Sequence, residues 1–113
     1  MNKYAQTAIR AVEYIKAGFN AEQAWEKASC EYFEKGSSSQ KKGCPKGAFL
    51  GLFSKNSGKN ADYATKALEI LREHPQHKYS KYELWKLVTD GEVKAHNSQM
   101  DVVLALWNNN LIG

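Results

Sequence analysis

The sequence has few of the features that would place a chain in a membrane or in an oxidising compartment. Its longest apolar run, Ala48–Phe53, is far shorter than the about 20 residues that span a bilayer. Charged side chains interrupt the N-terminal residues, which leaves no stretch typical of a secretory signal. Only two cysteines occur, Cys30 and Cys44, and we expect both to stay reduced. The sequence therefore predicts a cytoplasmic protein with no membrane association.

Acidic residues are missing from the middle of the chain. Residues 36–60 contain five lysines and no aspartate or glutamate, whereas charges nearly cancel in the rest of the sequence, whose net charge is +4. This segment could attract an anionic ligand or partner, although a lysine-rich loop is more often simply solvated. The lysines concerned are Lys41, Lys42, Lys46, Lys55 and Lys59.

Composition and periodicity predict one helical domain over residues 1–113. The chain is 42% hydrophobic and 25% charged, as is ordinary for globular proteins, and no strand pattern is visible. Apolar residues recur at helical spacing in about six segments, with capping pairs at Asn20 and Gln23 and at Ser80 and Glu83. We therefore expect an all-α, compact bundle of about six helices, whose C-terminal part is helix-turn-helix-like in architecture. The expected helices cover residues 4–17, 21–32, 45–53 and 81–89, a segment capped by Asn60 and ended by Pro75, and a segment opened by Ser98.

The third expected helix contains two glycines four residues apart, Gly47 and Gly51. One face of this helix is therefore bare backbone, which lowers its intrinsic stability. This pattern predicts that another helix or a ligand approaches that face closely. Gly36–Gly43, just before this helix, has the composition of a flexible loop.

The start of the same helix is the first candidate site. Lysines surround the expected helix N-terminus, where free amides and the helix dipole favour an anion. The segment does not match the phosphate loop of ATPases, because Gly43 is followed by Cys44 and no strand precedes it. The candidate residues for binding an anion or partner are Lys41, Lys42, Gly43, Cys44, Lys46 and Gly47.

Cys44 supports an alternative interpretation as the nucleophile of a small cysteine-dependent enzyme. The helix dipole and the neighbouring lysines would favour its thiolate, and His96 could act as the base. Against this, Cys44 also fits a small, half-buried helix cap. Anion binding should survive Cys44→Ser, whereas cysteine chemistry should not.

A second polar cluster surrounds the start of the last helix and contains His96, Asn97, Gln99 and Asp101. Helix capping explains such a cluster, and a polar ligand or partner is the alternative. Because residues 95–113 contain no lysine or arginine, a nucleic acid would bind through residues 36–60 and not through the C-terminal helix. We expect no cofactor and no metal site, since His74 and His77 offer only two imidazoles.

Two segments, Lys42–Leu52 and His96–Trp107, resemble the hallmarks of a family of small bacterial and phage-associated proteins of unknown function. These segments read KGCPKGAFLGL and HNSQMDVVLALW. The resemblance implies a single domain and a bacterial origin, and it assigns no site.

Together these patterns favour a non-enzymatic binding module for an anionic or protein partner around residues 41–47. The alternatives are the cysteine-dependent enzyme and a nucleic-acid-binding protein that uses residues 36–60. A cleft shared by residues 41–47 and 96–101 would strengthen the case for a site.

Overall fold

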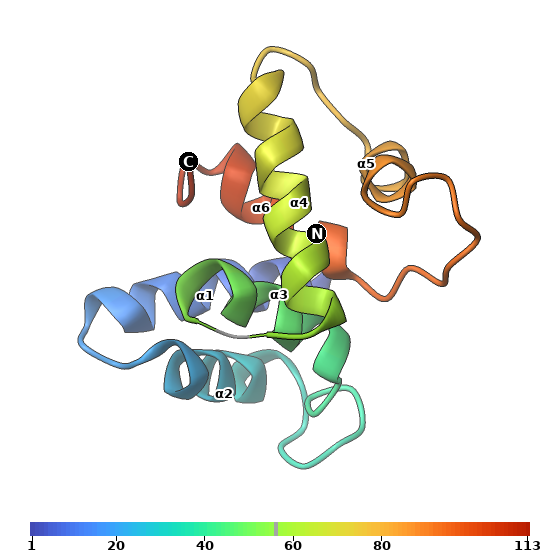
Figure 1. The fold of residues 1–113 in the computed structure, drawn as a ribbon. Coiled ribbons are helices and arrows are strands. Elements are labelled where there is room, and N and C mark those ends of the chain that lie inside the picture. The colour runs from blue at the N-terminus through green and yellow to red at the C-terminus, as the bar shows by residue number, and fades with distance from the viewer. Residues whose placement is uncertain (56) are drawn as a thin grey trace.

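The computed structural model describes residues 1–55 and 57–113, and in those residues six helices and no strands are found (Figure 1). The predicted all-α bundle is therefore confirmed. None of the helices in these residues is long and apolar enough to cross a membrane. The helices are α1 Lys3–Lys16, α2 Ala21–Tyr32, α3 Gly43–Phe53, α4 Lys59–Glu73, α5 Lys81–Val88 and α6 Gln99–Asn108.

Helices α1 and α2 form the predicted hairpin and lie side by side in Figure 1. The Asn2 side chain caps α1 by accepting hydrogen bonds from the amides of Tyr4 and Ala5. Asn20 and Gln23 make both hydrogen bonds of the predicted capping box at the start of α2. Local sequence signals therefore determine where the hairpin turns.

Helix α3 lies between α2, α4 and α6, and its two glycines form the crossing with α4. A Cβ atom on Gly51 would lie 2.6 Å from the Cα atom of Ala61, and one on Gly47 would lie 2.9 Å from the Cβ atom of Asn60. No larger side chain fits at either position without a shift of its neighbours. The predicted close approach is therefore confirmed, and a helix makes it.

The start of α4 differs from the sequence prediction. Asn60 does not cap this helix, because α4 already begins at Lys59, preceded by Gly58 with a φ of +122°. Glycine reaches this backbone conformation readily, so the chain enters the helix earlier than Asn60. The side chain of Asn60 instead accepts a hydrogen bond of 2.9 Å from Gln99 at the start of α6.

The last two helices begin near the predicted residues, but the cap of α6 is different. Ser80 caps α5 by accepting a hydrogen bond from the Glu83 amide. Ser98 immediately precedes α6 in a left-handed conformation, with φ +66°, and its side chain makes no capping bond. Residues 89–98 join α5 to α6, a connection longer than the about three or four residues of a helix-turn-helix turn. The likeness to that motif is thus limited to the order of the two helices.

The loop between α2 and α3 is attached to the body of the domain, contrary to the flexible loop predicted from its composition. Gln40 is only 5% exposed, and its side chain donates a hydrogen bond of 2.9 Å to the Ser29 hydroxyl. The Tyr4 hydroxyl donates a further bond of 2.8 Å to the carbonyl of Ser39. These bonds fix the chain that leads into α3, and with it the position of Lys42.

Candidate functional site

Three basic side chains from separate parts of the sequence form the candidate site. Lys42 precedes α3, Lys81 is the first residue of α5, and His96 lies in the connection before α6. We call these three residues the basic cluster. The pKa of His96 is lowered, first by burial and then by the positive charges of Lys81 and Lys42, whereas the Asp101 carboxylate opposes the change. The start of α1 links the two lysines, because the Lys42 ammonium lies 5.7 Å from the centre of the Tyr4 ring and Lys81 lines a pocket together with Asn2.

The two predicted segments, 41–47 and 96–101, also meet through Asn60. This residue touches the Gly47 face of α3 and accepts a hydrogen bond from Gln99, which is 3% exposed. The side-chain oxygen of Gln99 in turn accepts a bond of 2.6 Å from the Asn97 amide. The starts of α3, α4 and α6 are consequently joined into one polar junction beside the basic cluster.

His96 is held by three neighbours. Its Nε2 atom accepts a hydrogen bond of 3.1 Å from the Met100 amide, and this bond caps α6 in place of the Ser98 hydroxyl. The rings of Tyr82 and Trp85 meet the imidazole edge-on, with centroids 5.9 and 5.2 Å away. Because Nε2 accepts, the capping form of His96 is neutral and carries its proton on Nδ1.

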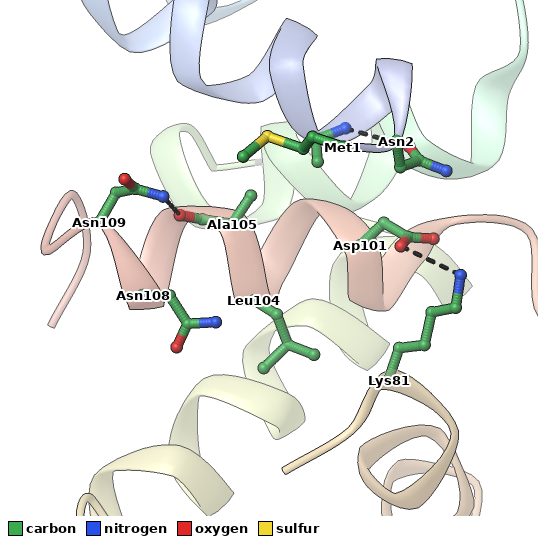
Figure 2. A pocket seen from close by; sticks show the side chains of 9 residues that line it. Met1, Asn2, Lys81, Asp101, Leu104, Ala105, Asn108 and Asn109 are labelled. Atoms are coloured by element: carbon green, nitrogen blue, oxygen red, sulfur yellow. Dashed lines mark hydrogen bonds and ion pairs between the residues drawn. The ribbon is translucent and has the colours of Figure 1, made fainter. Parts of the chain in front are cut away.

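A pocket of about 360 Å³ opens next to the cluster, between the start of α1, the exposed side of α6 and the start of α5 (Figure 2). Leu104 and Ala105 of α6 supply apolar atoms to its wall. Lys81 and Asp101 form an ion pair of 3.4 Å across one end of it, as the dashed line in Figure 2 shows. The pocket thus offers a mixed apolar and polar surface beside the positive charges.

The start of α3 has the free amides that its sequence predicted. No side chain caps this end, and its first turn contains no acidic residue. Lys41 and Gly43 are exposed, while Lys46 is partly neutralised by an ion pair of 3.3 Å with Glu22. Lys42 lies on the side of α1, with its ammonium 5.7 Å from the centre of the Tyr4 ring.

The alternative catalytic pair, Cys44 and His96, stays a prediction. In the described residues no hydrogen bond joins the Cys44 thiol to a base, and His96 already uses Nε2 to cap α6. His74 and His77 are likewise not part of any group of three or more potential metal ligands in the part of the chain that the structure describes.

Sequence reasoning missed Lys81 and Tyr82. A lysine in the first turn of a helix opposes the helix dipole, and this is one signal that could have drawn attention to Lys81. Tyr82 lies outside the buried stripe of Leu84, Trp85 and Val88, which is typical of a side chain that faces solvent. The ring is 66% exposed.

Comparison with known proteins identifies a family and no closer relative. The sequence profile of a family described as "Family of unknown function (DUF6979)" matches residues 1–113. No curated protein and no solved structure is significantly similar to the chain.

Proposed function

We propose that the chain, which belongs to the DUF6979 family of unknown function, is a non-enzymatic module that binds an anionic group of a ligand or partner at its basic cluster. The observation that carries this proposal is that distant parts of the sequence bring two lysines to the start of α1: the Lys42 ammonium lies over the Tyr4 ring, and Lys81 lines a pocket together with Asn2. Lysines that serve only solubility need not lie close together in the folded protein.

The charge balance at the cluster supports an anion as the ligand. The charges of Lys42, Lys81 and Asp101 that act on His96 sum to +1, and the Asp101 side chain, which pairs with Lys81 at 3.4 Å, is only 12% exposed. Attraction between charges is stronger near such partly buried groups than between fully solvated ones. The uncapped start of α3 adds amide donors on the side of Lys42. An acidic or phosphate-bearing group would therefore be attracted by positive charge and would also accept hydrogen bonds.

The finer expectations from sequence support the same picture. The resemblance of residues 42–52 and 96–107 to small bacterial and phage-associated proteins supports a bacterial or phage-associated origin. Cys30 and Cys44 are both free, as is usual in a reducing compartment, so the proposal places the protein in the cytoplasm.

Retention on immobilised heparin tests the proposal. Replacing both Lys42 and Lys81 with alanine removes two charges from the cluster, so this variant should elute at a clearly lower salt concentration than the unmodified protein. The matched control replaces Lys16 and Lys27 with alanine, which removes the same net charge. Both lysines lie toward the end of the α1–α2 hairpin that is opposite Tyr4. Equal shifts in the two double variants would show that heparin senses only total charge, and would overturn the proposal.

A further inference from the structure

We propose that the partner is single-stranded nucleic acid, held along a strip of alternating cations and aromatic rings that passes through the basic cluster. This inference rests on the proposed function and names the class of anion. We call the surface the cation–aromatic strip. Its members are Lys3, Tyr4, Phe33, Lys42, Lys81, Tyr82 and His96.

The first half of the strip joins the start of α1 to the end of α2 and the start of α3. The Lys3 ammonium lies 5.8 Å from the centre of the Phe33 ring, which packs on the Tyr4 ring at a centroid distance of 4.7 Å. The Lys42 ammonium lies 5.7 Å from the centre of that same Tyr4 ring. Two lysines thus flank a pair of rings tilted by 31°.

The second half surrounds His96 and lies beside the start of α1, because Lys81 and Asn2 line the same pocket. The Lys81 ammonium lies 5.3 Å from the centre of the Tyr82 ring, and this ring meets His96 at 5.9 Å. The buried Trp85 supports the imidazole from behind. Because the Tyr82 ring is 66% exposed, a flat ligand can reach it without moving the core.

The pairing of cations with rings favours a single strand over other anions. Proteins that bind single strands place phosphates on basic side chains and stack bases on aromatic rings. A duplex hides its base faces and would contact only the lysines, while an acidic polypeptide offers carboxylates but few flat rings. Helix α6 has no lysine or arginine to enter a groove, so duplex recognition by that helix lacks its main source of affinity.

Fluorescence anisotropy with a labelled oligothymidine of roughly 12 nucleotides, a length within the usual site size, tests the inference. The unmodified protein should bind this strand more tightly than a duplex of equal length. Tyr82→Ala should weaken binding of the strand by between about 5-fold and 150-fold, as expected for the loss of one stacked base. Tyr82→Phe keeps the ring and should retain the affinity. Heparin retention should be the same in all three proteins, because no charge is lost.

The control on the same helix is Leu87→Ala, which removes an exposed apolar side chain that is not in the strip. If Tyr82→Ala and Leu87→Ala bind the strand equally well, or if poly-glutamate binds as tightly as the strand, the nucleic-acid inference is wrong and the general anion proposal stands. If the Lys42 and Lys81 double variant also keeps its heparin retention, the proposed function itself fails.

Discussion

At the scale of single residues, His96 links the stability of the domain to pH. The neutral ring caps α6 through Nε2, and burial keeps the pKa of His96 in the folded protein below its ordinary value of about 6.5. The unfolded chain therefore binds a proton at this residue more readily than the folded chain. The contribution of His96 is fully present above about pH 6.5 and is lost as the pH falls below that value.

The variant His96→Gln separates this effect from the background of other titrating groups. A glutamine amide oxygen can accept the hydrogen bond from Met100, and glutamine does not titrate. Between about pH 7 and about pH 5, the free energy of unfolding of the unmodified protein should fall by on the order of 1 kcal/mol more than that of the variant. This difference is the usual contribution of a helix cap, and urea titrations at each pH measure it. Parallel stability curves for the two proteins would contradict this role of His96.

At the scale of elements, the crossing of α3 and α4 depends on Gly51. We expect Gly51→Ala to lower the free energy of unfolding by about 1–3 kcal/mol, because the added methyl group meets the backbone of Ala61, which cannot move aside easily. This loss should exceed the gain in helix propensity of up to about 1 kcal/mol.

Gly43→Ala is the matched control in the same helix, since its added Cβ atom meets nothing within 4 Å. Its stability should be unchanged or slightly higher in the same urea titration. A Gly51→Ala variant as stable as Gly43→Ala would mean that the two helices have room to separate.

The elements also show which sequence signals were sufficient. The capping box of Asn20 and the glycine pair of α3 were interpreted correctly, because each depends on neighbours within a few residues or on the lack of a side chain. Asn60 has equally good capping chemistry, yet it pairs with Gln99 from another helix. Local propensity cannot indicate which of two partners an asparagine takes, because the second partner is brought near only by tertiary packing.

At the scale of the whole molecule, the sequence predicted both halves of the candidate site but not their meeting. Lys42 and His96 were named from local chemistry, one at a helix start and the other in a polar cluster. Lys81 was identified only from the packing of α5 beside α6, because the sequence around Lys81 does not indicate that contact. Candidate charged residues can thus be identified from the local sequence, whereas their arrangement into one site depends on how the helices pack.

The most direct test of anion binding at the basic cluster is an NMR titration of the His96 ring with pH, with and without sulfate at constant ionic strength. A bound anion favours the protonated ring, so sulfate should raise the pKa of His96. Sulfate should change the resonances of the exposed His74 ring, which lies at the C-terminal end of α4, much less than those of His96. The Lys42 and Lys81 double variant should show a raised pKa of His96 before sulfate is added and little further change. If sulfate moves the resonances of His74 as much as those of His96, or moves neither, the basic cluster is not an anion site.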